Sequence, residues 1–246
     1  MYHVTFRGTH REAGLRRGRF LASHGNFILQ NAPFPVTQAR LQFAQQCVPI
    51  YRRFFPAVLQ EIEGLAEGQG CAPQALQAIL FSMYAMPPAS CCSCFAVSNG
   101  AQVFLARNSD FLLALQHWNG NVIYRLDGRC FYFTGNTTAF VEIEDGVNEH
   151  GLAAGLTSVS PGRIQPGLNA GMLLRLMLET CRTVEQALAL ARRVPIASAQ
   201  TLTLADAGGA IAVLECNSSR LEVVRPAPGR PFVCATNTFH SPSMRY

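Results

Sequence analysis

The sequence predicts an α+β fold in which helices cover antiparallel sheets. Three observations support this prediction. Residues 1–90 carry apolar residues mostly at helical spacing, residues 94–159 and 201–235 carry short apolar runs separated by turn residues, and two more helical segments lie between these blocks. Strands joined by short turns form antiparallel sheets, and helices grouped between blocks of strands form layers over them.

The helical segments have recognisable starts and ends. Pro56 and Pro73 stand at first helical positions, where the missing N–H leaves no hydrogen bond unmade, and Pro87 ends the third segment. Thr183 is an expected N-cap, with Gln186 at the capping-box position. The expected helices cover residues 37–55, 57–65, 74–86, 170–181 and 183–193.

The expected strands are separated by hairpin signals. Asn99-Gly100, Asp127-Gly128 and residues 206–209 are turn sequences between apolar runs, and Asn-Gly in particular favours a tight hairpin. The expected strands cover residues 94–97, 102–106, 122–126, 130–134, 139–143, 152–159, 201–205, 210–216, 221–224 and 232–235.

All twenty basic residues are Arg, and the chain contains no Lys. This composition excludes Schiff-base chemistry, a pyridoxal phosphate anchor, a P-loop lysine and a Ser–Lys dyad. The formal net charge of +5 is spread without the basic runs of a nucleic-acid footprint, so no nucleic-acid partner is expected. No apolar run reaches the length of about 18 residues that a membrane span needs, so no membrane partner is expected either.

The nine Cys residues are an odd number, and residues 1–20 carry Arg and Gly where a secretory signal needs an apolar stretch. We therefore expect mostly reduced thiols and a cytoplasmic location. An apolar content of 49% and a charged content of 14% fit a well-packed globular chain built around one sizeable domain.

Thiols are concentrated in the motif Cys91-Cys92-Ser93-Cys94, which admits four interpretations. A zinc site would need a second ligand pair, and no further C-x-x-C or H-x-x-x-H is present, so no metal is expected. Cys94 fits core packing at the start of a strand. A Cys–His pair with His150 or His240 as base, and an N-terminal Cys nucleophile exposed by chain cleavage, are the two catalytic interpretations.

The second catalytic interpretation is supported by a resemblance. Cys92-Ser93-Cys94-Phe95-Ala96-Val97 is followed by Ala106-Arg107-Asn108-Ser109-Asp110-Phe111, with Asp110 eighteen positions after Cys92. Further matching motifs lie at residues 8–18, 63–68, 145–153, 175–187, 205–215 and 236–239. In these motifs the sequence resembles the N-terminal-nucleophile (Ntn) hydrolases of linear amides, the group of penicillin acyltransferase-like enzymes and choloylglycine hydrolases.

The resemblance implies a four-layer αββα sandwich of antiparallel sheets. Residues 1–91 would form a helical leader and residues 92–246 a catalytic domain. This domain would be short at its C-terminus, because chains of the family continue past the element that matches Thr236-Asn237-Thr238-Phe239. The family pattern also implies autocatalytic cleavage before Cys92.

The resemblance further implies the roles of site residues. Cys92 would be the nucleophile, Arg107 would lie beside its sulfur and favour the thiolate, and Asp110 would orient the new α-amino group. Asn237 would donate to the tetrahedral oxyanion, with a backbone N–H of the segment Thr157-Ser158 as the second donor. Taken singly, Arg107 and Asp110 also fit a surface ion pair, and Asn237 also fits a turn.

The expected activity is hydrolysis of a linear amide through an acyl-enzyme. A free α-amine has a pKa of about 8 and can accept the thiol proton, so this chemistry requires no catalytic His. Acyl transfer to an amine or CoA, a non-catalytic binding protein on the same scaffold and a Cys–His thiol protease are the alternatives.

The expected partner is a small-molecule amide, with no cofactor. Its class stays open among bile-salt conjugates, penicillins, acyl-homoserine lactones and peptides, as does association into a homo-oligomer. The apolar residues 111–115 and Trp118 follow the site motif directly, and they fit either an acyl pocket or the core.

Overall fold

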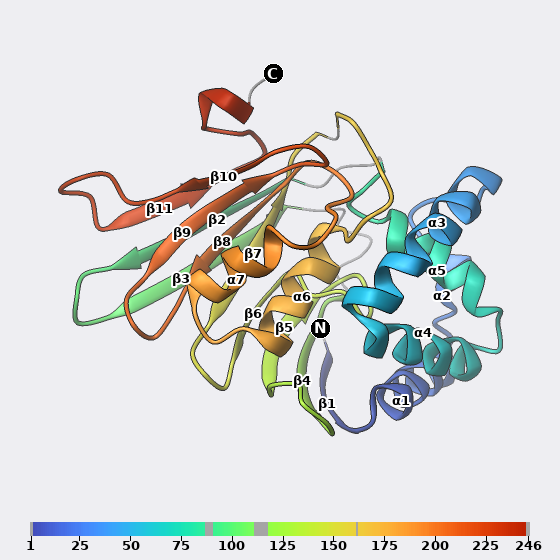
Figure 1. Ribbon diagram of the computed structural model, residues 1–246. Helices are drawn as coiled ribbons and strands as arrows, with labels where there is room; N and C mark the ends of the chain where they lie inside the picture. Colours follow the sequence, from blue (N-terminus) through green and yellow to red (C-terminus); the bar gives the residue numbers. More distant parts are fainter. Residues whose placement is uncertain (1, 87–90, 111–117, 161, 245–246) are drawn as a thin grey trace.

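A computed structural model describes residues 2–86, 91–110, 118–160 and 162–244 of the chain. Two β-sheets lie face to face, and helices pack against the larger of them (Figure 1). The α+β class predicted from the sequence is therefore confirmed. The apolar stretch at residues 111–115 lies outside the described residues.

The large sheet has eight strands in the order β1-β4-β5-β6-β7-β8-β9-β10. Its neighbours are antiparallel except β1 and β4, which run parallel. The strands are β1 Tyr2–Gly8, β4 Gly120–Leu126, β5 Phe133–Thr137, β6 Asp145–Asn148, β7 Ala153–Ser158, β8 Gln200–Ala205, β9 Ile211–Cys216 and β10 Leu221–Val224.

The small sheet has three antiparallel strands in the order β11-β2-β3. They are β2 Cys91–Ser98, β3 Val103–Asp110 and β11 Phe232–Ala235. At the predicted β2–β3 hairpin, the Asn99 side chain accepts hydrogen bonds from the N–H groups of Ala101 and Gln102, and Gly100 has a φ of +86°. The inner face packs on β8 and β9 through a small apolar cluster, whereas Phe95 and Phe104 on the outer face are exposed.

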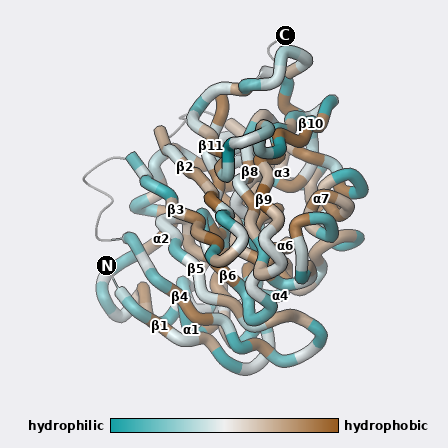
Figure 2. Tube along the Cα trace, turned by 90° about the vertical axis from the view of Figure 1, so that its left-hand side faces the viewer, coloured by the Kyte–Doolittle hydropathy of each residue, from teal (hydrophilic) through white to brown (hydrophobic). Residues whose placement is uncertain are grey.

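The helices form two groups (Figure 1). α6 and α7 lie on the large sheet, and α6 is buried along almost its entire length. Helices α1 to α5 gather beside the sheet near β1, whereas the short C-terminal turn lies by β10 (Figure 1). Hydrophobic segments lie mainly in the interior (Figure 2). The helices are α1 His10–Ser23, α2 Ile28–Asn31, α3 Gln38–Phe54, α4 Pro56–Gln69, α5 Pro73–Ser82, α6 Ala170–Thr180, α7 Val184–Ala191 and the 3-10 turn η2 Pro242–Met244. No helix within the described ranges is long and apolar enough to cross a membrane.

Glycines allow α1 and α4 to pack backbone against backbone. A Cβ on Gly14 would lie 1.9 Å from the carbonyl oxygen of Glu61, and a Cβ on Gly64 would lie 2.0 Å from that of Arg11. Such separations are far below van der Waals contact, so only glycine fits at either position.

Three local predictions differ from the structure. Residues 2–8 form an edge strand within the stretch expected to be mostly helical, because Tyr2, Val4 and Phe6 alternate and pair with β4. Residues 139–143 form a buried turn instead of a strand, with Phe140 at a φ of +59°. The third expected helix ends at Ser82, shortly before Tyr84 adopts a φ of +57°.

Residues 2–86 do not form a separate core. β1 belongs to the large sheet, and residues of α1, α3, α4 and α5 share one hydrophobic cluster with α6, α7 and the strands. The Cys91–Cys92 bond lies at the start of β2.

Candidate active site

Strand alternation in β2 turns Cys92 toward the protein interior. Cys92 is 3% exposed, its neighbours Cys91 and Ser93 are exposed, and Cys94 is buried again. Cys94 lies against β7, because a Cβ on Gly155 would meet its sulfur at 2.7 Å. Cys92 and Cys94 therefore face the large sheet, whereas Cys91 lies on the opposite face of β2.

Arg107 of β3 brings a buried positive charge to the Cys92 sulfur. Its Nη2 lies 3.0 Å from Cys92 Sγ, and its Nε donates to the carbonyl oxygen of Leu156 at 2.7 Å. Its Nη1 lies 3.2 Å from a carboxylate oxygen of Glu144 and 3.2 Å from one of Asp145. The guanidinium thus uses all three nitrogens, and its planar fork is fixed beside the sulfur.

The two carboxylates are themselves held by polar neighbours. Glu144 accepts hydrogen bonds from the Tyr84 hydroxyl at 2.9 Å and from the N–H of Thr138 at 3.0 Å. Asp145 accepts a bond from the Asn136 side-chain amide at 2.6 Å, and burial raises the pKa of Asp145 above its ordinary value.

Burial disfavours the charge of Arg107, but Glu144, Cys92 and Asp145 outweigh it, and the pKa of Arg107 is raised. Arg107 therefore stays charged in the site.

Asn237 fixes the backbone on the other side of Cys92. The Cys92 N–H donates to Asn237 Oδ1 at 3.0 Å, and Asn237 Nδ2 donates to the carbonyl oxygen of Ser158 at 2.7 Å. The buried Thr157 hydroxyl lies beside that of Thr201 and donates to the Thr236 carbonyl at 2.6 Å. Asn237, in the segment that follows β11, is thus held by the end of β7 and by the start of β2.

Asp110 lies at the end of β3, directly opposite Cys91 in the β2–β3 register. Its side chain is exposed and accepts a hydrogen bond from Asn108 at 2.6 Å. No hydrogen bond joins Asp110 to Cys92 within the described part of the uncleaved chain. The structure thus brings Cys92, Arg107 and Asn237 together, and leaves Asp110 at the rim.

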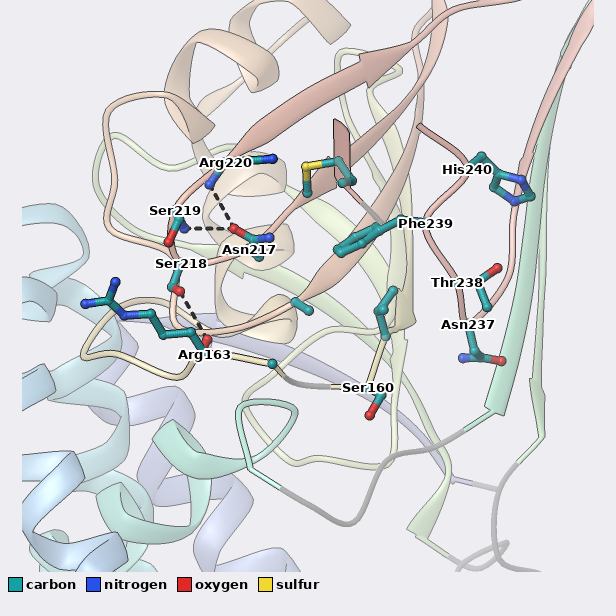
Figure 3. Close-up of a pocket in the computed structure, with 14 residues that line it drawn as sticks. Ser160, Arg163, Asn217, Ser218, Ser219, Arg220, Asn237, Thr238, Phe239 and His240 are labelled. Atoms are coloured by element: carbon teal, nitrogen blue, oxygen red, sulfur yellow. Dashed lines mark hydrogen bonds between the residues drawn. The ribbon is translucent and has the colours of Figure 1, made fainter. Parts of the chain in front are cut away.

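The two candidate histidine bases have other contacts, and His240 shares a cavity with Asn237. His150 stacks edge-on against Phe131, with ring centroids 4.3 Å apart. The N–H of His240 donates to Glu215, and its ring belongs to the loop beyond Asn237 (Figure 3).

A cavity of about 1020 Å³ extends from Asn237 along the end of β7 (Figure 3). Arg163, Asn217 and Arg220 line its far side, and Phe239 projects into it. A smaller cavity of about 430 Å³ reaches Arg107 and Asp145 from the other side. Both cavities give a small molecule access to residues around Cys92.

Sequence reasoning missed the carboxylates and the tyrosine around Arg107. The stretch Val141-Glu142-Ile143-Glu144-Asp145 places three acidic residues in an apolar context, and all of them are largely buried. Acidic residues in a buried stretch require positive or hydrogen-bonding partners, and that signal was available in the sequence. Tyr84 left no comparable signal, because its contact with Glu144 spans 60 positions.

Two solved structures show limited similarity to this chain. Penicillin V acylase from Agrobacterium tumefaciens is 19% identical with a TM-score of 0.38, and the match covers 61% of this chain and 44% of that one. A variant of conjugated bile acid hydrolase from Clostridium perfringens is 14% identical with a TM-score of 0.33, over 60% of this chain and 45% of that one. The chain thus spans less than half the length of either structure. No curated protein matches it.

A family model gives the stronger comparison. The model described as acyl-coenzyme A:6-aminopenicillanic acid acyl-transferase matches residues 97–245, which is more than half of the chain and begins just after Cys92. The matched segment includes Arg107, Thr157 and Asn237. The chain therefore belongs to the acyl-coenzyme A:6-aminopenicillanic acid acyl-transferase family.

Proposed function

We propose that this protein cleaves a linear amide, with Cys92 as the nucleophile after the bond between Cys91 and Cys92 is broken. The observation that supports this most directly is the pair of contacts on Cys92. Arg107 Nη2 lies 3.0 Å from its sulfur, and Asn237 Oδ1 accepts its N–H at 3.0 Å. One residue thus has its thiol beside a cation and its nitrogen in a fixed orientation.

The proposed cleavage is an N-to-S acyl shift followed by hydrolysis. The Cys92 thiolate attacks the carbonyl carbon of Cys91, so that an S–C bond forms, the C–N bond breaks and the departing nitrogen takes up a proton. Water then hydrolyses the thioester, which releases the Cys91 carboxylate and restores the thiol. Arg107 places its positive charge beside the sulfur in both steps.

The new α-amine then serves as the general base for its own thiol. The thiolate attacks the substrate carbonyl, the amine protonates the leaving nitrogen, and an acyl-enzyme remains. Asn237 takes the role of oxyanion donor if its Nδ2 leaves the Ser158 carbonyl and turns to the substrate. Asp110, which lies opposite Cys91 in the β2–β3 register, would accept a hydrogen bond from the α-amine once the chain is open.

Acyl transfer is the second candidate, and the description of the family favours it. In that reaction an amine or a CoA thiol replaces water in attacking the acyl-enzyme. The cavity of about 1020 Å³ next to Asn237 has room for an acceptor as well as an acyl group. Adding increasing acceptor concentrations to a hydrolysis assay separates the two reactions, because transfer diverts product away from the free acid.

The test is turnover of acyl amides from several classes by the purified chain, including a penicillin and a glycine-conjugated bile acid. We expect activity in the wild-type protein, none in Cys92→Ala, and wild-type activity in Cys234→Ala, an exposed thiol on the neighbouring strand. An acyl adduct on the peptide that begins with Cys92 would support the assignment. Equal activity of Cys92→Ala and Cys234→Ala would refute it.

A further inference from the structure

Three potential metal ligands, each from a different part of the chain, come close together in the fold. His10 begins α1, Cys130 precedes β5, and Glu179 lies in the last turn of α6. One ligand atom from each lies within 4.8 Å of the other two, and His10 Nε2 is 3.1 Å from Glu179 Oε2. His10 and Glu179 are buried and Cys130 is partly buried.

This donor set suits a borderline transition metal such as Zn²⁺, which binds imidazole, thiolate and carboxylate. Zinc–ligand distances of about 2.0–2.3 Å place tetrahedral ligand atoms about 3.3–3.8 Å apart. The separations here are 3.1 Å for the His10–Glu179 pair and at most 4.8 Å for the others, so a shift of about 1 Å forms the site.

One carboxylate oxygen of Glu179 has His10 as its partner, and a metal ion would take the place of the proton between the two groups. Arg175 donates to Glu179 Oε1 at 2.8 Å, and its other nitrogens bond to Glu61, which is fully buried beside it. Arg175 is thus shared between Glu61 and Glu179, and the buried Arg17 lies near Glu61 as a second cation, while Glu179 Oε2 faces His10. When a Zn²⁺ ion binds and the Cys130 thiol loses its proton, the net charge of the cluster rises by one. Protonation of His10 would raise it by the same amount.

Arg175 also fixes the ligand geometry. Hydrogen bonds from outer groups hold metal-binding carboxylates in position. A cavity of about 410 Å³ lined by His10, Cys130 and Glu179 reaches the same point, so a water molecule and an incoming ion have access.

We propose that His10, Cys130 and Glu179 form a three-ligand site for a divalent transition-metal ion, with a fourth position open to the cavity. The ion would join the start of α1, the β4–β5 connection and the end of α6. The alternative for the same cluster is a second Cys–His–Glu nucleophile. A nucleophilic Cys130 would react freely with electrophiles, whereas a Cys130 that ligates a metal ion would be shielded by the bound cation.

The first experiment measures Zn²⁺ affinity by competition with a chromophoric chelator, in the full-length chain. Every arm carries Cys92→Ala, so that neither cleavage nor the thiol at position 92 affects metal uptake. We expect one tight Zn²⁺ site that Cys130→Ser and His10→Gln each weaken by more than about 100-fold. The matched controls Cys71→Ser, a partly buried thiol, and His24→Gln, an exposed imidazole, should leave the affinity unchanged.

The second experiment needs no substitution at the cluster and so remains decisive if Cys130→Ser or His10→Gln fails to fold. Zn²⁺ should slow alkylation of Cys130 but not of Cys71, as measured on the separate peptides. Co²⁺ should give the charge-transfer band of a thiolate ligand. Unchanged alkylation of Cys130, or affinities equal in Cys130→Ser and Cys71→Ser, would overturn the proposal. So would rapid, zinc-insensitive alkylation of Cys130, which indicates a nucleophile.

Discussion

Arg107 is the residue on which the geometry at Cys92 depends. It joins four groups, namely the Cys92 sulfur, the Leu156 carbonyl and the carboxylates of Glu144 and Asp145. A planar guanidinium can reach all four at once because its N–H groups point in fixed directions. An ammonium group of equal charge lacks that fork.

We therefore expect Arg107→Lys to lower activity by roughly 10- to 100-fold, the loss that corresponds to one charge-assisted hydrogen bond of about 1.5–3 kcal/mol. The rate of a thiol-directed electrophile at Cys92 should fall in parallel. The exposed Arg125 supplies the control, since Arg125→Lys changes no contact of the site. Unchanged electrophile rates in Arg107→Lys would mean that Arg107 does not act on the sulfur.

Asn237 allows its two proposed roles to be separated. Asn237→Asp keeps an oxygen that accepts from the Cys92 N–H but loses the amide donor. We expect this variant to cleave its chain and to lose ~100- to 1,000-fold in kcat, the usual effect of removing one oxyanion donor. Asn237→Ala should slow both steps. Chain-cleavage rates and kcat values measured for both variants test whether Asn237 has the two roles. Full turnover by Asn237→Asp would exclude the role of oxyanion donor.

At the scale of single residues, the resemblance of ordered motifs to a known family was enough to nominate Cys92, Arg107 and Asn237, which the structure brings together. It could not supply Tyr84 or Glu144, because their contacts depend on how the turn at residues 139–143 folds onto β3 and β7. It also nominated Asp110, whose side chain lies outside the contact set of Cys92 in the uncleaved chain.

At the scale of elements, the α1–α4 pair packs too closely for any side chain at its glycines. Gly64→Ala places a Cβ 2.0 Å from the carbonyl oxygen of Arg11, so the two helices must separate. We expect a loss of at least about 2 kcal/mol in the free energy of unfolding, measured by urea denaturation. Gly162→Ala is the control, because no atom lies within 4 Å of its added Cβ. Equal stability of the two variants would show that the helices tolerate separation.

Secondary structure was predictable where local signals were strong. The helices with N-caps or N-terminal Pro and the β2–β3 and β8–β9 hairpins lie where the sequence predicts them. β1 was not predicted, because its short alternation of apolar residues lies in a stretch that is otherwise mostly helical. Its partner strand, β4, is also more than a hundred positions away in the sequence. The mostly apolar residues 139–143 were expected to form a strand, but they form a buried turn. An apolar run therefore indicates burial without fixing the type of secondary structure.

At the scale of the whole molecule, a buried acidic group should make stability depend on pH. Burial raises the pKa of Glu142 well above its ordinary value, with Asn169 opposing the shift and the nearby Glu144 adding to it. The folded chain then binds a proton that the unfolded chain releases above a pH of about 4.3. Stability therefore falls as pH rises from that value toward the raised pKa.

We expect Glu142→Gln to remove this fall, because glutamine resembles the protonated acid and does not ionise. The free energy of unfolding of the wild type should decrease by up to about 1.4 kcal/mol per pH unit relative to Glu142→Gln. Urea denaturation between about pH 5 and about pH 8 measures the difference. The exposed Glu63→Gln should follow the wild-type curve, and parallel curves for Glu142→Gln would contradict the expectation.

Residues 2–86 share one core with the rest of the chain, so cleavage before Cys92 would leave two pieces of a single folded unit. The most direct test of the account is the intact mass of the purified wild-type and Cys92→Ala proteins under denaturing conditions. We expect the wild type to yield two polypeptides, residues 1–91 and 92–246, and Cys92→Ala to yield one. A wild-type chain that stays uncleaved yet has Cys92-dependent amidase activity, or equal cleavage of both proteins, would contradict the account.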